Sequence, residues 1–460
     1  MPRPAGALDA APDPAALKCA SVCEMQTARR SGVTSAWLGN GVRIHHRRIE
    51  READRIVVTI TLCGGKLLED NTTRGVSEIA AGVLDDWDGA APEASRTQRM
   101  EGRDVRIDAA AGQDALTIRI IGAHPEIEPA LAVVKELLVN PTVTREHVDE
   151  ARAQVVRELS RRAADPRSLV SDALNRGLLP DDDARMRPPD ERALLNITPD
   201  LVREWIQRQI RENGSPVEAS FVGDLSLPDA MRLADATLGA LPRRARPSPE
   251  TLADRRVIVA PPGAVKQDIR LGQVIPAAPR ATVIRGCFGP EMNELADQRA
   301  LRAVLRVATT RLKARLTPPR FNVPGGPSAG LYLSAFKGLG VAIIVAPVAE
   351  ESQVQRVADA IDEELVRLAR DGPTPEELAD ASADLARSAD KSDKDARYWS
   401  EALSRSTSMG MDPEEMAGGA AFYRALSPEQ ARSVLARYAK PDRAIALTIR
   451  APAPAESEIR

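Results

Sequence analysis

The sequence of 460 residues is poor in cysteine, histidine and aromatic residues: it has four Cys, four His and 3% aromatics. Four cysteines in a chain of this length do not make the dense disulfide framework of small secreted domains. Basic and acidic residues nearly balance, 63 against 66, and leave a formal net charge of -3. Binding to nucleic-acid phosphates needs a concentrated positive face, so this balance argues against a nucleic-acid partner.

Long apolar runs are also missing. No stretch approaches the roughly 20 apolar residues of a membrane-spanning helix. The first residues are rich in Ala and Pro and lack the apolar core of a signal peptide. We therefore expect no membrane span and a reduced, cytoplasmic protein.

The composition is that of a globular protein, with 43% apolar and 28% charged residues. The length exceeds that of one ordinary hydrophobic core and suits two domains of roughly 200 residues each. Because aromatic residues are scarce, Ala, Leu, Val and Ile must supply most of the core.

An internal repeat supports the same division. Thr144 and Thr374 each follow an amphipathic helical stretch and precede a first turn with acidic residues, at an offset of 230 residues. Thr198 and Ser427 are each followed by Pro and an acid, at an offset of 229 residues. Two helix-start motifs that recur at nearly the same offset indicate two homologous domains.

Strand and helix signals in each half indicate an α+β fold in which a largely antiparallel sheet is packed with helices. Runs rich in β-forming residues, such as 56–62 and 217–222, come before or between amphipathic helical stretches. We interpret Arg243, Arg244 and Arg246, in a Pro-rich joint, as solvated surface residues. The predicted divisions are a poorly ordered arm (1–30), an N-terminal domain (31–242), a linker (243–262) and a C-terminal domain (263–460).

Three motifs resemble those of one peptidase family. In chain order they are Leu38-Gly-Asn-Gly-Val-Arg-Ile44, Gly65-Lys-Leu-Leu-Glu69 and Gly75-Val-Ser-Glu-Ile-Ala-Ala-Gly82. This layout is similar to the pitrilysin/insulinase family of zinc metallopeptidases, which includes mitochondrial processing peptidase. The resemblance covers roughly residues 33–450 and implies a pitrilysin-type half clam-shell of two homologous domains.

The resemblance also shows which residues of the zinc motif are missing. In the family's H-x-x-E-H motif, Glu78 stands at the first His, Ala81 at the catalytic Glu and Gly82 at the second His. The third ligand position is retained as Glu158, 76 residues after Gly82. A catalytic zinc needs three protein ligands and a neighbouring base, so we expect no metal and no catalytic residue in this chain. A catalytic partner would carry the zinc.

Two further segments are weak substrate-binding candidates by the same resemblance. Arg315 stands where active members use an Arg to hold the substrate carbonyl, and Asn322 stands where they use a Tyr. An edge strand near Asp104 to Ala110 would line the inner wall, where an extended peptide could add by β-augmentation.

The remaining histidines and cysteines offer alternative metal sites that we do not favour. His45 and His46 are neighbours on a predicted strand, so their side chains should point to opposite faces. Cys19 and Cys23 could bind zinc with one of them, but unrelated thiols are the preferred interpretation. His147 begins half of an H-x-x-E-H pattern, and we interpret it as part of a solvated helix face.

The resemblance thus implies a non-catalytic subunit that closes a chamber and binds extended peptide for a homologous catalytic half, in a heterodimer or in one longer chain. One alternative is a scaffold or assembly subunit without a proteolytic role, because relatives of this fold are core subunits of the respiratory cytochrome complex. The other is an active zinc endopeptidase whose ligands align differently.

Overall fold

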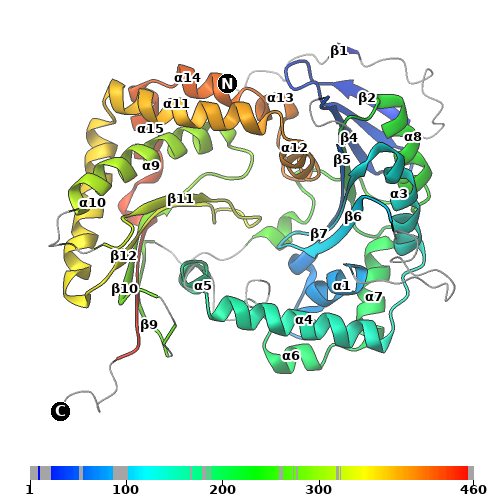
Figure 1. Cartoon of the computed structure of the whole chain (residues 1–460), viewed down its shortest axis with the longest axis horizontal. Helices are drawn as coiled ribbons and strands as arrows, with labels where there is room; N and C mark the ends of the chain where they lie inside the picture. The colour runs from blue at the N-terminus through cyan, green and yellow to red at the C-terminus, as the bar shows by residue number, and fades with distance from the viewer. Residues whose placement is uncertain are drawn as a thin grey trace. The chain divides into compact units, whose positions relative to one another are not determined.

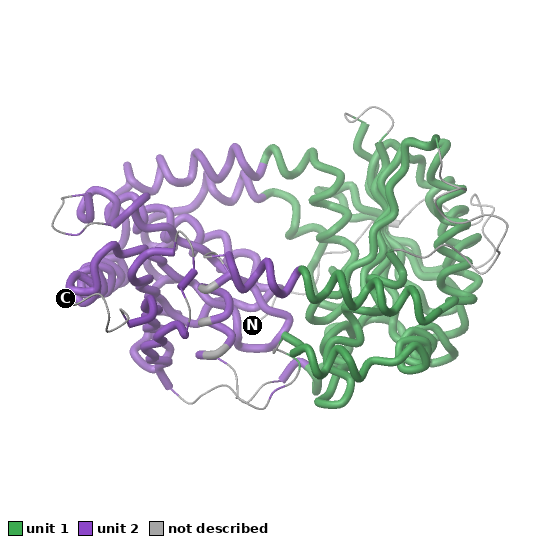
Figure 2. The backbone as a smooth tube through the Cα atoms, turned by 60° about the horizontal axis from the view of Figure 1, so that its bottom comes forward, with its two compact units in different colours: residues 1–157, 184–255, 390–418 green, residues 158–183, 256–389, 419–460 purple. Residues whose placement is uncertain are grey.

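The computed structural model describes residues 9–10, 22–50, 55–85, 102–165, 168–178, 183, 185, 188–257, 263–272, 274–275, 278–317, 321 and 323–453. The chain divides into two compact units (Figure 2). Unit 1 is made of Met1–Arg157, Ala184–Arg255 and Asp390–Gly418, and unit 2 of Glu158–Asp183, Arg256–Ala389 and Gly419–Arg460. This division differs from the two consecutive ranges expected from the sequence, because each unit includes a helical segment from the other half.

Unit 1 is built around a sheet with the strand order β1-β2-β3-β4-β8-β5-β7-β6 (Figure 1). Its strands are β1 (Asp9–Ala10), β2 (Val22–Thr27), β3 (Thr34–Leu38), β4 (Arg43–Arg48), β5 (Arg55–Cys63), β6 (Val105–Ala111), β7 (Ala115–Ala123) and β8 (Val217–Gly223). Its helices are α1 (Val76–Asp85), α3 (His124–Val139), α6 (Glu191–Leu195), α7 (Pro199–Ile210), α8 (Leu227–Leu238), α12 (Ala396–Leu403) and α13 (Pro413–Met416). Among the described strands of this sheet, only β4 and β8 pair in parallel, so the sheet is largely antiparallel.

Unit 2 repeats this arrangement with the strand order β11-β12-β10-β13-β9. Its strands are β9 (Val265–Arg270), β10 (Ala281–Phe288), β11 (Ser328–Tyr332), β12 (Val341–Val348) and β13 (Ala444–Arg450). Its helices are α5 (Ser168–Leu178), α9 (Leu295–Leu316), α10 (Val354–Asp371), α14 (Gly419–Ala425) and α15 (Pro428–Tyr438), while α4 (Arg145–Ala163) and α11 (Pro375–Ser392) contain a unit boundary. The order β6-β7-β5-β8-β4 of unit 1 matches β11-β12-β10-β13-β9, including one parallel pair at the same place. The expected α+β class is confirmed.

Helix caps follow the repeat that the sequence indicated. Thr198 and Ser427 each accept a hydrogen bond from a backbone N–H in the first turn of α7 and α15. Ser427 also forms a capping box with Gln430. Thr144 and Thr374 accept the corresponding bonds at the starts of α4 and α11. The equivalent positions of the two halves therefore begin equivalent helices.

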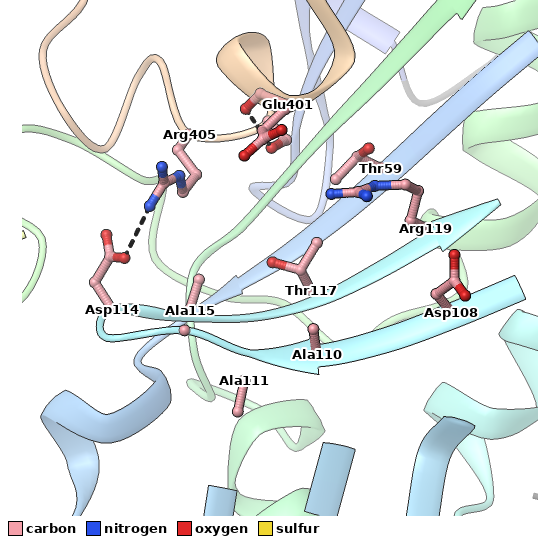
Figure 3. A pocket seen from close by; sticks show the side chains of 12 residues that line it. Thr59, Asp108, Ala110, Ala111, Asp114, Ala115, Thr117, Arg119, Glu401 and Arg405 are labelled. Atoms are coloured by element: carbon pink, nitrogen blue, oxygen red, sulfur yellow. Dashed lines mark hydrogen bonds and ion pairs between the residues drawn. The ribbon is translucent and has the colours of Figure 1, made fainter. Parts of the chain in front are cut away.

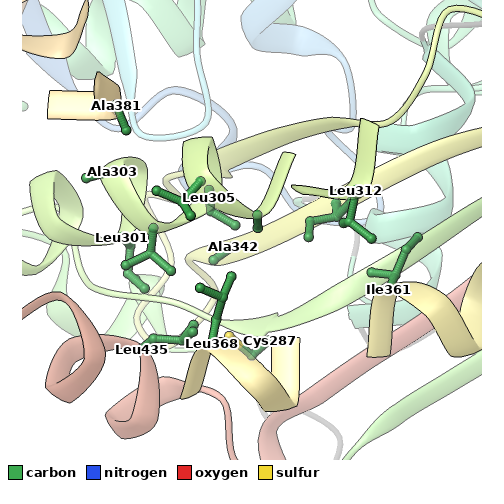
Figure 4. Packing of buried hydrophobic residues seen from close by; sticks show 14 of the residues in the cluster. Cys287, Leu301, Ala303, Leu305, Leu312, Ala342, Ile361, Leu368, Ala381 and Leu435 are labelled. Atoms are coloured by element: carbon green, nitrogen blue, oxygen red, sulfur yellow. The ribbon is translucent and has the colours of Figure 1, made fainter. Parts of the chain in front are cut away.

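The core of unit 2 consists of small and aliphatic side chains, as the scarcity of aromatics required. Leu301, Leu305 and Leu312 of α9 pack with Ile361 and Leu368 of α10 over one face of the sheet (Figure 4). Alanines contribute much of the remaining surface. Because alanine side chains are short, the helices approach the sheet and one another closely.

A segment of the second half is fixed to unit 1 through buried polar contacts. Ser400 of α12 hydrogen-bonds the hydroxyls of Thr59 (2.7 Å) and Ser220 (2.9 Å) on neighbouring strands. Just beyond this helix, the backbone N–H of Thr407 donates to the fully buried carboxylate of Glu218 at 2.6 Å. His45 lies 2.8 Å from the same carboxylate. These contacts make the segment part of the unit 1 fold.

Two segments expected to be loose are ordered in part. Val22–Thr27, within the expected arm, forms β2 and pairs with β3. Arg244, in the expected linker, is buried, and its guanidinium donates to the carbonyls of Ile210 and Ser215, both at 3.0 Å. The interpretation of Arg244 as a solvated residue is wrong, because this side chain satisfies carbonyls at the end of α7. Burial lowers the pKa of Arg244 to about 10.

One arginine joins three helices of unit 2. Arg311 of α9 donates through Nε (2.7 Å) and Nη2 (2.6 Å) to Glu377 of α11, and through Nη1 (3.0 Å) to the buried Glu364 of α10. These bidentate hydrogen bonds from Arg311 lower the pKa of Glu377 from 4.5 to about 2. The ion pair is therefore present throughout the neutral and mildly acidic range.

This pKa shift predicts how stability depends on pH. A depressed carboxyl pKa stabilises the fold fully above the unfolded-state pKa, and the contribution is lost as the pH falls toward the folded-state value. We expect the thermal stability of wild type to exceed that of Glu377→Gln at pH 7, and the difference to shrink between about pH 5 and pH 2. Glu376→Gln, at the exposed neighbouring position, is the matched control. A difference that stays constant with pH would contradict the ion pair.

Candidate functional site

The degenerate motif lies on α1, whose start is fixed by Glu69. The Glu69 carboxylate accepts hydrogen bonds from the backbone N–H groups of Gly75 and Ser77, both at 2.9 Å, and from the Ser77 hydroxyl. Burial raises the pKa of Glu69, although these hydrogen bonds favour its charged form. Gly75 has a φ of 90°, a conformation that favours glycine. The motif Gly65–Glu69 and the Gly before α1 therefore position the helix.

Glu78, at the first ligand position, already has a cation as its partner. Its Oε1 lies 2.5 Å from Nζ of Lys66, and each side chain is about one-fifth exposed (20% and 22%). The second oxygen, Oε2, is buried and has no hydrogen-bond partner in the part of the chain that the structure describes. A metal ligand at this position would first have to give up the Lys66 pair.

The other two motif positions are closed by packing. Ala81 is buried, and Gly82 faces α4, where a Cβ atom added at Gly82 would lie 2.8 Å from Cβ of Ala151. Real Cβ atoms do not approach so closely, so any side chain at position 82 requires α1 or α4 to move. The second ligand position is therefore lost sterically as well as chemically.

Glu158, at the retained third ligand position, lies in the part of α4 that belongs to unit 2. It is exposed, and its two carboxylate oxygens accept from Nε (2.9 Å) and Nη2 (2.8 Å) of Arg161. Hydrogen bonding to Arg161 lowers the pKa of Glu158. The carboxylate is therefore charged and engaged in an intrahelical ion pair.

These residues do not fit a zinc site. Within the described ranges, no group of three or more His, Cys, Asp or Glu side chains is arranged to hold a metal ion. Of the aligned positions, only two carry a carboxylate, and each of these is paired with a cation. Zinc sites in proteins use deprotonated, uncommitted donors in tetrahedral geometry. We therefore derive no zinc-dependent step for this chain.

His45, His46 and Cys23 form no shared metal site in the part of the chain that the structure describes. His45 lies 2.8 Å from Glu218, whereas His46 points to the opposite face and contacts the Leu225 carbonyl at 2.8 Å. This is the alternation that the strand predicted. Burial lowers the pKa of both imidazoles. Cys19 lies outside the described residues, and Cys23 is a half-buried free thiol.

The substrate-binding candidates belong to different units of the chain. Arg315 of α9 donates from Nη1 to the carbonyl of Ala360 at 3.1 Å and pairs with Glu363 of α10, both within unit 2. Asn322 lies outside the described residues. Asp104 is exposed and directly precedes β6 in unit 1.

The structure adds two features beside β6 that the sequence did not reveal. The backbone N–H of Ala109 donates to Oδ1 of Asp85, at the end of α1, at 2.9 Å. A cavity of about 230 Å³ lies on the polar face of β5, β6 and β7 and includes Thr117 and Arg119 in its lining (Figure 3). The only sequence signal for the cavity was the polar position of Thr117 and Arg119 in an alternating strand.

The packing at Gly82 can be tested by restoring the motif. We expect Gly82→His to lower the free energy of unfolding by about 1–3 kcal/mol, because an overpacked interface forces α1 and α4 apart. Ala151→Gly should recover part of that loss in a double-mutant cycle measured by chemical denaturation. Additive effects of Gly82→His and Ala151→Gly would show that the two positions are not in contact.

Comparisons with known proteins bear on the fold of the chain. The family described as Peptidase M16 inactive domain matches residues 196–385. No curated protein sequence matches the chain. A solved peptidase M16 inactive domain from Pseudomonas fluorescens is 17% identical, with a TM-score of 0.75, and the match covers 92% of this chain and 99% of that one.

Longer solved proteases match over part of their length. For the periplasmic protease PqqL from Escherichia coli, the TM-score is 0.71 at 17% identity, over 93% of this chain and 48% of that chain. For a mutant of the ferredoxin protease FusC in complex with Arabidopsis ferredoxin, the TM-score is 0.73 at 14% identity, over 94% of this chain and 46% of that chain. This chain thus spans about half the length of these two proteases. The expected resemblance to the pitrilysin/insulinase family is thereby confirmed: the chain has the fold of M16-type peptidases, and residues 196–385 match the family described as Peptidase M16 inactive domain.

Proposed function

We propose that this chain is a non-catalytic peptidase-like subunit that binds an extended peptide and closes a chamber with a homologous catalytic half. The observation that carries the proposal is the state of the zinc motif. Glu78 is paired with Lys66, and Gly82 packs so closely on Ala151 that a ligand side chain has no room. Such a subunit can bind peptide but has no means of activating a water for hydrolysis.

The partner follows from the length of the matched proteases. PqqL and FusC are each about twice the length that this chain covers, which supports pairing with a second, homologous half. That half is either a separate subunit or another part of a longer chain, and it would carry the zinc. FusC was solved in complex with ferredoxin, a protein ligand, which supports a polypeptide as the bound substrate.

The proposed peptide site is the outer edge of β6. Among the described strands, β6 pairs only with β7, so its other edge faces no strand. The hydrogen bond from Ala109 to Asp85 shows that the Ala109 N–H points away from β7. In an antiparallel pair, alternate residues direct their backbone groups to the same side, so Val105 and Ile107 present N–H and C=O groups outward as well. An extended peptide could add there by main-chain hydrogen bonds.

Asp85 occupies one position of this edge. Its carboxylate takes the Ala109 N–H that would otherwise bond to a peptide carbonyl. Under the proposed function, a bound peptide either ends its pairing before Ala109 or displaces Asp85. The side chain therefore sets the extent of the peptide register and lowers the affinity for longer peptides.

Peptide binding to Asp85→Ala tests the proposed function. We expect the variant to bind a fluorescent, extended peptide roughly fivefold more tightly than wild type, because a hydrogen bond of about 1 kcal/mol no longer competes. Fluorescence anisotropy measures the affinity, and Asp200→Ala, on an exposed part of α7, is the control. Absence of peptide binding by both proteins would overturn the proposed site. Equally tighter binding by the Asp200→Ala control would show that Asp85 does not compete with the peptide.

The scaffold alternative makes a different prediction in the same assay. An assembly subunit without a substrate role has no reason to bind unrelated extended peptides at β6. The fold alone also occurs in one chain of Complex III2 from Candida albicans, which matches this chain with a TM-score of 0.70 at 14% identity. No contact within the described residues favours this alternative over peptide binding.

A further inference from the structure

A cavity of about 230 Å³ lies within unit 1 beside the proposed peptide site. Its floor is the polar face of β5, β7 and β6, represented by Thr59, Thr117 and Asp108. Its opposite wall is formed by Glu401 of α12 and the turn that follows this helix (Figure 3). Because the floor includes β6 itself, side chains of a peptide added to that strand would project along the same face.

Most of the charges around the cavity are already neutralised. The carboxylate of Asp114 is almost fully buried, and its Oδ1 accepts from Nη1 of Arg405 at 3.1 Å. The carboxylate of Asp108 accepts from Nε of Arg106 at 2.5 Å. Two of the three acids that line the cavity therefore have a cation of their own. The third, Glu401, is an exposed residue of α12.

Arg119 is the exception among the cations. It lies on β7 between Thr59 and Asp108, its register partners on the two neighbouring strands. Its side chain is half-buried, and none of the described residues forms a hydrogen bond or an ion pair with its guanidinium. Figure 3 shows the guanidinium extending along the cavity floor toward Thr59. A guanidinium has five donors, and here none of them has an acceptor among the described residues.

We propose that Arg119 binds a carboxylate of the peptide held on β6, so that the cavity selects peptides with an acidic group at that point. This inference rests on the proposed peptide-binding function. A guanidinium binds a carboxylate through two parallel hydrogen bonds, a geometry that a neutral amide cannot reproduce. Partial burial reduces the screening by water and strengthens such a pair relative to one on the open surface.

The distances are compatible with direct contact. Neighbouring strands are about 4.8 Å apart, so a peptide added to β6 would lie about 10 Å from β7. An arginine and a glutamate extending toward each other across one strand can span this distance. The intervening residues, Asp108 and Ala110, have short side chains, and Asp108 is already held by Arg106.

The test compares two labelled peptides that differ only in one Glu or Gln and have amidated C-termini. Wild type should bind the Glu peptide at least tenfold more tightly than the Gln peptide. Arg119→Met should remove this preference while keeping the affinity for the Gln peptide, and Arg119→Lys should keep part of it. Arg208→Met is the control, because this arginine is exposed on α7, pairs with Glu204 and does not line the cavity. Circular dichroism and thermal melting confirm that each variant folds.

The outcomes separate this inference from the proposed function. Equal binding of both peptides by wild type, or a preference that survives Arg119→Met, overturns the inference and leaves peptide binding intact. No binding of either peptide by wild type overturns the proposed function, and this inference with it. A third peptide, with Gln and a free C-terminal carboxylate, shows whether Arg119 binds a side-chain carboxylate or the carboxylate at the peptide end. Tight binding that depends on Arg119 would assign the carboxylate to the peptide end rather than to a side chain.

Discussion

The close contact between Gly82 and Ala151 prevents α1 from carrying a side chain at position 82. The family's catalytic geometry needs a ligand side chain at position 82, and here the neighbouring helix fills that space. Restoring the ligand residues by substitution would therefore not restore the site, because α1 and α4 would also have to move apart. The ion pair of Glu78 with Lys66 adds a second barrier, because a metal would have to compete with a cation already in place. The proposed non-catalytic role rests on these two contacts.

The polar face of the unit 1 sheet links this loss to the proposed binding role. Near β4, β8 and β5, the face is covered by a segment from the second half, held by the buried Glu218 and by Ser400. Toward β7 and β6 it opens into the cavity that contains Arg119. Buried carboxylates and hydroxyls on a sheet face are costly unless they are hydrogen-bonded. Here the buried carboxylate and hydroxyls attach the packed segment, whereas the half-buried Arg119 has no acceptor among the described residues.

The sequence predicted the fold well because its signals are local. Capping residues at Thr198 and Ser427 and the nearly constant offset between the halves sufficed for two homologous α+β domains. The exchange of helical segments between the units could not be predicted, because it depends on long-range packing such as that of Ser400 on Thr59. The motif alignment showed which zinc ligands are missing, but it could not show that Gly82 packs against Ala151. Arg244 was misinterpreted because the sequence of a Pro-rich, Arg-rich joint does not show which arginine is buried against backbone carbonyls.

The most direct test of the central claim is native mass spectrometry with metal analysis of this chain after gentle purification from its native source. The account predicts a second chain, or second half, of similar size with an intact H-x-x-E-H motif and about one zinc ion per pair. A chain that by itself binds zinc stoichiometrically and cleaves peptides in a chelator-sensitive manner would contradict the account. Isolation inside a larger assembly that lacks peptidase activity would contradict it in favour of the scaffold role.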